Sequence, residues 1–242
     1  MLFPSSFTLP RWVEAVAPGS HLHVIEVDPE VTAVGTRWLG VKLAAPPSDR
    51  FPNESGIAVI HGDARRVIRS LPAGVYDVVI GDAFADMAVP WHLTTVEFAR
   101  EVRRVLRPGG RYAVNVIDGW PGGQFLPAFL RTLQEAFAEV DALSTALPGF
   151  PKYDVVQNWV ATAGDAPLEI ASLEAMTRPG LTTEGVPVAV PPRVRLVTRS
   201  GVAPIPATDP EAPPWVDAAR AIRPLTDDLA PVDWYLGRRL AE

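Results

Sequence analysis

The sequence predicts an α/β fold built on a doubly wound, mainly parallel sheet whose first strand is truncated, with a proline-rich C-terminal arm. First, short apolar runs with strand character alternate with amphipathic stretches of helical period. Second, the run at residues 76–84 is apolar without alternation, which is typical of a parallel strand covered on both faces. Third, acidic residues close four of the expected strands.

The expected elements follow one another at regular spacing up to residue 164. Residues 7–20 predict a short helix that Pro-Gly-Ser ends, with Leu9, Trp12, Val13 and Val16 on one face. Residues 94–110 predict an amphipathic helix ended by Pro-Gly-Gly. Further strands are expected at 21–27, 57–63, 76–84, 111–118 and 153–164, and further helices at 28–40, 64–74 and 123–140.

The chain divides by composition into three expected segments. Residues 1–177 carry the alternating pattern and form the expected ligand-binding domain. Residues 178–214 are dense in proline and are expected to form a surface arm, within which 194–198 could be a strand. Residues 215–242 regain helical and aromatic character and are expected to dock back onto the domain.

Composition excludes several classes of function. The 242 residues include no cysteine, which excludes disulfides, zinc–thiolate sites and thiol nucleophiles. The net charge of −6 argues against nucleic acid and anionic membrane as partners and is compatible with a cationic substrate. No apolar run approaches the roughly 20 residues of a membrane span, no signal peptide is recognised, and a cytoplasmic location is expected.

The acidic strand ends are Glu26, Asp63, Asp82 and Asp118. A single acidic residue at such a position is about as often only a helix cap or turn residue as it is part of a ligand site. Parallel strands linked by right-handed crossovers, however, bring their carboxyl ends to one edge of the sheet. Four acidic residues along that edge therefore predict a ligand site. The four histidines, in contrast, show no spacing typical of metal ligands.

The strand that ends at Glu26 raises a question about the start of the chain. In dinucleotide-type folds an acidic residue at this place follows a glycine-rich turn by about 20 residues. Counting back from Glu26 reaches Pro4, Ser5 and Ser6, where no glycine stands. The glycine turn is therefore expected to be lost or to lie upstream, with residues 1–3 as a stub of the first strand.

Several segments resemble the spermidine synthase family, which has the Rossmann-like class I methyltransferase fold. These are "VIEVDPEV", "IHGDARRVI", "YDVVIGDAF" and "PWHLTTVEFAREVRRVLRPGGRYAVNV", together with "PLTDDLAPVDWYL" near the C-terminus. The match is nearest to the divergent bacterial branch and covers roughly residues 7–165 and the last twenty. The order and spacing of these segments are more specific to the family than any one of the motifs alone.

The resemblance implies roles for individual residues. Glu26 matches the residue that binds the ribose hydroxyls of S-adenosylmethionine or its decarboxylated form, and Asp63 the residue that reads the adenine amino group. Ala64 would follow under the adenine ring. Asp82 matches the base of aminopropyl transfer and also lies on the cofactor side. A base suits this chemistry, because the acceptor amine must lose a proton before it attacks.

The chain departs from the family pattern on the amine side. The family's small N-terminal β-domain and glycine loop have no counterpart before residue 7. Asp86 stands four residues after Asp82 rather than three, so it matches the second amine-binding aspartate only approximately. Tyr153 is the candidate for the later substrate-side tyrosine.

Three functions remain open. The first is an aminopropyltransferase that uses decarboxylated S-adenosylmethionine and a polyamine or other amine, without a metal, with a homodimer as a possible assembly. The second is an S-adenosylmethionine-dependent methyltransferase, and the third a catalytically inactive remnant or binding module. Asp82 and the residues after it favour the first over the second, whereas the absent glycine loop favours the third.

Overall fold

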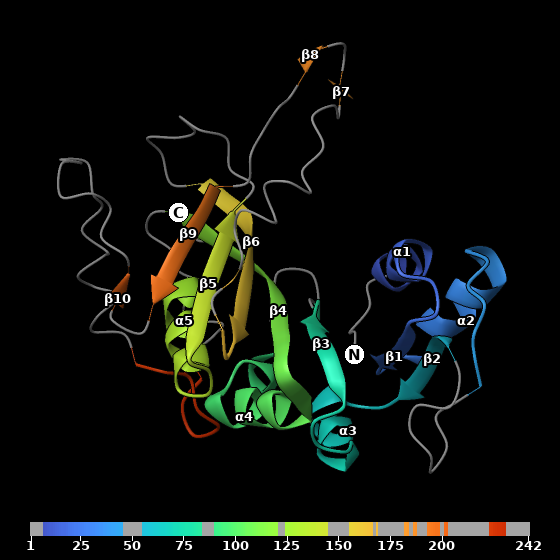
Figure 1. Ribbon diagram of the computed structural model, residues 1–242, viewed down its shortest axis with the longest axis horizontal. Coiled ribbons are helices and arrows are strands. Elements are labelled where there is room, and N and C mark those ends of the chain that lie inside the picture. Colours follow the sequence, from blue (N-terminus) through green and yellow to red (C-terminus); the bar gives the residue numbers. More distant parts are fainter. Residues whose placement is uncertain are drawn as a thin grey trace.

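The strands of the computed structural model form three groups, and the two that build the main body lie side by side (Figure 1). The structure describes residues 7–45, 55–83, 90–120, 124–144, 155–166, 168, 182–183, 186–187, 193–198, 201–202 and 223–230. β1 (His21–Glu26) and β2 (Gly56–His61) pair in parallel as the first group. The second is a six-stranded sheet of order β10-β9-β5-β6-β4-β3. Its strands are β3 (Tyr76–Gly81), β4 (Leu106–Trp120), β5 (Glu139–Ser144), β6 (Val155–Gly164), β9 (Arg193–Thr198) and β10 (Gly201–Val202).

Strand directions follow the predicted doubly wound pattern. β3 pairs with β4 in parallel, whereas β6 is antiparallel to both β4 and β5. β3, β4 and β5 therefore run in one direction, and β6 and β9 run against them. No strand among the described residues lies between β1 and β3, which is the place expected for the truncated first strand. The predicted stub at residues 1–3 lies outside the described residues.

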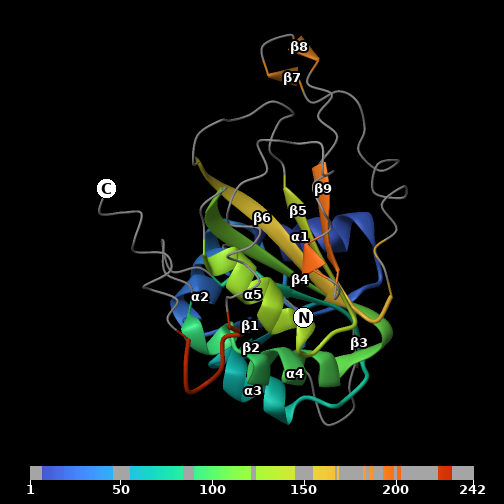
Figure 2. The same ribbon diagram turned by 90° about the vertical axis from the view of Figure 1, so that its left-hand side faces the viewer.

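Helices connect the strands of the first half of the chain. α4 and α5 lie next to one another against β4, as Figure 2 also shows. Side chains of Asp28, Asp63 and Thr95 cap α2, α3 and α4 by accepting from the backbone amides of Glu30, Arg66 and Phe98. The helices are α1 (Thr8–Val16), α2 (Pro29–Trp38), α3 (Ala64–Ser70), α4 (Val96–Val105) and α5 (Phe125–Gln134), with the 3₁₀ turn η1 (Trp91–Leu93) before α4.

Two helix ends differ from the prediction. α4 ends at Val105, and the residues up to Gly110 instead join β4 through a register shift opposite β3. Gly109 has φ of 77°, and a Cβ on Gly110 would lie 3.0 Å from the Tyr76 carbonyl oxygen. The two glycines therefore serve an irregular strand rather than a helix end.

The expected helix at 123–140 ends at Gln134, and β5 follows it. β5 lies between β6 and β9, so Val140, Asp141 and Ala142 are all buried. A short strand buried on both faces has no alternating pattern, and periodicity does not distinguish it from the end of a buried helix.

The expected proline-rich arm contributes strands to the structure. β9 pairs antiparallel with β5, with Val197 opposite Val140. It includes residues 194–198, the part of the arm for which a strand was expected. β7 (Thr182–Thr183) and β8 (Val186–Pro187) form a separate two-stranded pair. The boundaries of the three expected segments stay predictions.

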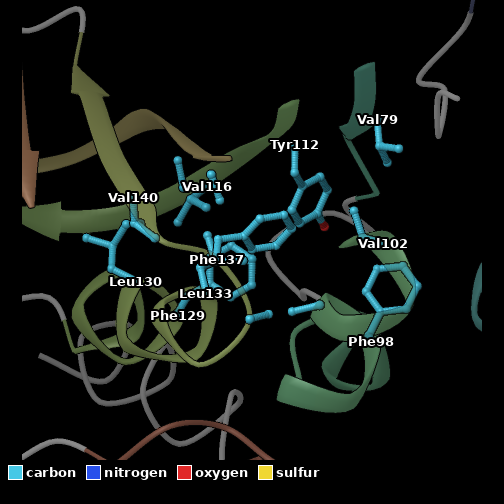
Figure 3. Packing of buried hydrophobic residues seen from close by; sticks show 14 of the residues in the cluster. Val79, Phe98, Val102, Tyr112, Val116, Phe129, Leu130, Leu133, Phe137 and Val140 are labelled. Carbon is cyan, nitrogen blue, oxygen red and sulfur yellow. The ribbon is translucent and has the colours of Figure 1, made fainter. Parts of the chain in front are cut away.

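The main core fills the space between the six-stranded sheet and α3, α4 and α5. Figure 3 shows Tyr112 and Val116 of β4 facing Phe137 and the helix residues Phe129 and Leu133. The rings of Tyr112 and Phe137 stack with centroids 6.3 Å apart. Burial raises the pKa of the Tyr112 hydroxyl, so this group stays neutral.

A smaller core joins α1 to β1 and β2, and it corrects the expected face of α1. Trp12 and Val16 are exposed, whereas Phe7, directly before the helix, is fully buried with Leu22, Val24, Val41 and Ile57. Leu9 and Val13 pack against this cluster as expected.

Side chains link the two strand groups. The His23 imidazole Nδ1 lies 3.0 Å from the Tyr76 hydroxyl, which joins β1 to the start of β3. Ile25 of β1 belongs to the main core, and Ile80 of β3 packs against the smaller core. Burial lowers the pKa of His23 to about 4 and raises that of Tyr76, so a hydrogen bond between neutral groups is expected at neutral pH.

Gly35→Ala should destabilise the protein. The added Cβ would lie 2.8 Å from Cδ2 of the buried Phe7 ring, a distance that requires the core to shift. Overpacking of this kind costs about 1–3 kcal/mol, which should exceed the gain of about 1 kcal/mol in helix propensity. Thermal denaturation should show a lower midpoint for Gly35→Ala and little change for Val34→Ala, at an exposed position of α2. A midpoint for Gly35→Ala at or above the wild-type value would contradict the packing described.

His23 should make the protein lose stability in acid. The unfolded state takes up a proton near pH 6.5 and the folded state only near pH 4, so stability is lost as the pH falls between these values. His23→Asn, which keeps a polar atom near Nδ1 but does not titrate, should remove up to about 3 kcal/mol of this loss. The measurement is the unfolding midpoint of the wild type and of His23→Asn at pH values from 7.5 to 4.5. If the midpoints of the two proteins fall in parallel with pH, the prediction is wrong.

Candidate functional site

Glu26 is held at the end of β1 by the turn that follows it. Its carboxylate is buried and accepts a 2.8 Å hydrogen bond from the backbone amide of Asp28. Asp28 in turn accepts from the amide of Glu30 at 2.9 Å and caps α2, which begins at Pro29. The strand end and the helix start therefore fix the place of this carboxylate.

Asp63 lies at the neighbouring strand end. The amide of Gly62, directly before Asp63, donates to the carbonyl oxygen of Glu26 at 2.9 Å, so the ends of β1 and β2 are joined. One oxygen of Asp63 accepts from the amide of Arg66 at 3.0 Å and caps α3. The other lies 3.0 Å from Nε2 of His92 in η1. Asp63 thus combines the helix-cap role with a place on the expected ligand edge.

Ala64 begins α3, directly after Asp63, and is buried against the main core. Its small side chain lets the helix start close to the sheet. Its expected place under an adenine ring stays a prediction.

Asp82 directly follows β3 and is half-buried. The side-chain amide of Asn115 in β4 donates to its Oδ1 at 3.1 Å. The register explains the contact, because Gly81 pairs with Val114 on the adjacent parallel strand. Asp86 and Tyr153, the two expected amine-side residues, lie outside the described residues.

Asp118 has a structural partner. Its buried carboxylate accepts a 2.8 Å hydrogen bond from the backbone amide of Leu126 in the first turn of α5. A carboxylate there satisfies a helix-end amide and favours the positive end of the helix dipole. The prediction that Asp118 closes its strand is wrong, because β4 continues to Trp120 and Asp118 lies inside it, opposite Gln157.

Sequence reasoning missed Asn115, which was not among the expected site residues. A signal was present, because Asn115 is a polar residue inside the apolar strand run "YAVNVI". Asn115 is half-buried, and a polar side chain shielded from water in this way is expected to have a hydrogen-bond partner. His92 was likewise not among the expected site residues, because its contact with Asp63, 29 residues away in the sequence, depends on the fold.

Two further classes of site were searched for in the described ranges. No group of three or more histidine, aspartate or glutamate side chains there could hold a metal ion. None of the helices described has the length and apolar character to cross a bilayer.

Comparison with known proteins first gives the class of the fold. A probable spermidine synthase from Corynebacterium glutamicum superimposes with a TM-score of 0.65 at 23% identity, covering 93% of this chain and 71% of that one. Human methyltransferase-like protein 13, solved with SAH, matches with a TM-score of 0.52 at 21% identity over 69% of this chain and 71% of that one. The protein has the class I methyltransferase fold.

The sequence comparison finds similarity to polyamine aminopropyltransferases over part of the chain. A polyamine aminopropyltransferase of Vibrio vulnificus is 29% identical over 113 residues, which are 46% of this chain. The match spans about a third, 34%, of that relative's length. No protein-family model matches the chain. These curated relatives are polyamine aminopropyltransferases, which agrees with the resemblance to the spermidine synthase family seen in the sequence.

Asp118→Ala should lower stability without changing the ligand edge. Loss of a helix-capping side chain costs about 0.5–2 kcal/mol, and here it would also leave a buried amide without its carboxylate partner. Asp77→Ala, at a carboxylate of β3 that is 64% exposed, should change stability by less than about 0.5 kcal/mol. Chemical denaturation of both variants measures the free energy of unfolding. Equal values for the two variants would show that the hydrogen bond of Asp118 to α5 does not stabilise the fold.

Proposed function

We propose that this protein is an aminopropyltransferase that transfers the aminopropyl group of decarboxylated S-adenosylmethionine to a diamine such as putrescine. The observation that carries the proposal is Asp82, a half-buried carboxylate at the end of β3 whose Oδ1 is held by Asn115. A base placed at this strand end matches the position that the family uses for aminopropyl transfer.

The cofactor would be held on the neighbouring strand ends. Glu26 would accept hydrogen bonds from the ribose hydroxyls, and Asp63 one from the adenine amino group. The hydrogen bond from Gly62 to Glu26 supports this assignment, because it joins the two strand ends that the adenosine must span. Both carboxylates accept backbone amides already, but a carboxylate offers about four lone-pair sites, so each retains acceptor capacity.

Asp82 would act on the acceptor amine. The amine is mostly protonated near neutral pH, and transfer of its proton to Asp82 exposes the nitrogen lone pair. That lone pair attacks the aminopropyl carbon beside the sulfonium, a C–N bond forms and the C–S bond breaks. The electron pair of the broken bond stays on sulfur, which leaves methylthioadenosine as the second product. The sulfonium is an activated leaving group, so these steps balance without a metal ion or covalent nucleophile.

Asn115 would orient the base. Its amide donates to Oδ1 of Asp82 and so fixes the rotation of the carboxylate about its own axis. Holding a catalytic group in the productive orientation contributes directly to rate, because less freedom is lost in the transition state. Asp86 and Tyr153 remain the proposed contacts for the amine, whose positive charge suits the acidic chain.

Methyl transfer from S-adenosylmethionine is the second candidate. Its specific support is the likeness to human methyltransferase-like protein 13, which was solved with SAH on the same fold. The two reactions differ in the group that leaves the same sulfonium and in the cofactor that each needs. An inactive remnant or binding module is the third outcome that the experiment distinguishes.

Asp82→Asn should abolish most transfer while leaving cofactor binding nearly unchanged. Loss of a general base lowers the rate by about a hundredfold to ten-thousandfold, whereas the isosteric amide keeps the packing and can reorient toward Asn115. The measurements are calorimetric titration with decarboxylated S-adenosylmethionine, S-adenosylmethionine and methylthioadenosine, and an aminopropyl-transfer assay with putrescine. Asp77→Asn, an exposed carboxylate on the same strand, is the matched control.

The outcomes separate the three functions. Transfer that depends on Asp82 but not on Asp77, with preference for the decarboxylated cofactor, supports the proposal. Methyl transfer without that preference moves the assignment to the methyltransferase. Binding of methylthioadenosine without any transfer indicates a binding module.

A further inference from the structure

The chain returns to the main core at residues 223–230, which we call the returning segment. Leu225 is buried between α4 and α5, where its amide donates to the Thr132 hydroxyl and its carbonyl accepts from Val96, both at 2.8 Å. Backbone hydrogen bonds between Thr226 and Leu229 close a tight turn. The two aspartates of "TDDL" therefore sit on a turn whose base is anchored in the core.

Asp227 of that turn forms a charged network with α3 and α4. Arg65 of α3, whose side chain is 12% exposed, forms an ion pair with Asp227. The Thr95 hydroxyl, at the start of α4, donates to Asp227 Oδ1 at 2.8 Å and accepts from Arg65 at 2.8 Å. The Asp227 amide also donates to Glu97 at 3.1 Å. Three elements far apart in the sequence thus meet at one guanidinium.

The same guanidinium reaches the turn next to the candidate site. Arg65 donates to the carbonyl oxygen of His92 at 2.6 Å, and the His92 ring contacts Asp63 at 3.0 Å. Arg65 lies two residues after Asp63 on α3, so the side chains and backbone close a ring of contacts from Asp63 to His92 to Arg65 and back. Of the three side chains in this ring, that of Arg65 is the most buried, and Asp227 balances its positive charge.

We infer that Arg65 and Asp227 are positioning residues for the Asp63–His92 pair, and that the returning segment acts through them on the adenine side of the site. The inference rests on the proposed function only for the identity of the ligand. Leu225 anchors the segment through its burial and its two backbone hydrogen bonds, which do not involve Asp227. Their geometric effect is to fix the Arg65 fork, whose planar donors then hold η1 at a set distance from α3.

Asp227→Asn and Arg65→Met test the inference, with Asp228→Asn as the control. Asp228 carries the same charge one residue further along the turn and is exposed. The amides of Leu93 and Thr94, which donate to Pro90 and Trp91 within η1, should exchange hydrogen about tenfold faster in Asp227→Asn. Affinity for methylthioadenosine should fall about threefold to tenfold, and KM for the cofactor should rise while kcat is retained.

A double-mutant cycle adds a readout that a general loss of stability would not give. Because Arg65 and Asp227 act as one unit, the double variant should lose no more affinity than Arg65→Met alone. Unchanged exchange at Leu93 and Thr94, or equal effects of Asp227→Asn and Asp228→Asn, would overturn the inference. Faster exchange without loss of affinity in a protein that binds methylthioadenosine would also overturn it.

The two proposals fail separately. If the wild-type protein binds no adenosyl ligand, the proposed function is wrong, and the exchange rates still decide whether Asp227 holds η1. If the wild-type protein binds and transfers but the exchange rates of the variants are unchanged, only the positioning role is lost.

Discussion

The packing of β1 against β3 determines how the two strand groups of this protein fit together. The described residues contain no strand pairing between them, so side chains must define the distance and the angle. Burial of an isoleucine contributes about 1.5–3 kcal/mol, against about 1 kcal/mol for a hydrogen bond between neutral groups. The buried Ile25, assisted by the partly buried Ile80, therefore contributes most to holding the groups together, and the directional contact of His23 with Tyr76 sets their register.

The boundary between the two strand groups, which we call the junction, also divides the candidate site. Glu26 and Asp63 belong to the group of β1 and β2, whereas Asp82 follows β3 in the other group. A ligand that contacts all three must span the junction, so its affinity depends on packing that lies beneath the site. The C-terminal contacts of Arg65 act on the same side of the junction as Asp63, which gives a physical route from the returning segment to the site.

Periodicity and strand-end chemistry made much of the fold predictable. β1, β2, β3 and α2 lie within a few residues of the expected ranges, because each has a clear pattern bounded by a turn or cap. β5 could not be recognised, since a six-residue strand buried on both faces looks like the end of the helix before it. The Arg65–Asp227 contact joins residues 162 apart, and no local pattern encodes a pairing of that kind.

The four acidic residues that were predicted at strand ends show why residue type alone could not separate structural from functional carboxylates. Glu26, Asp63 and Asp118 each accept a backbone amide from the turn or helix that follows. Such a donor is fixed by the backbone, so breaking the bond requires the carboxylate to turn away, at a cost of about 0.5–2 kcal/mol. Asp82 accepts from the side-chain amide of Asn115, which lies on the adjacent strand β4 rather than on the segment that follows Asp82. The register of β3 against β4 therefore sets the direction of the proposed base, whereas the other three carboxylates are oriented by the segments that follow them.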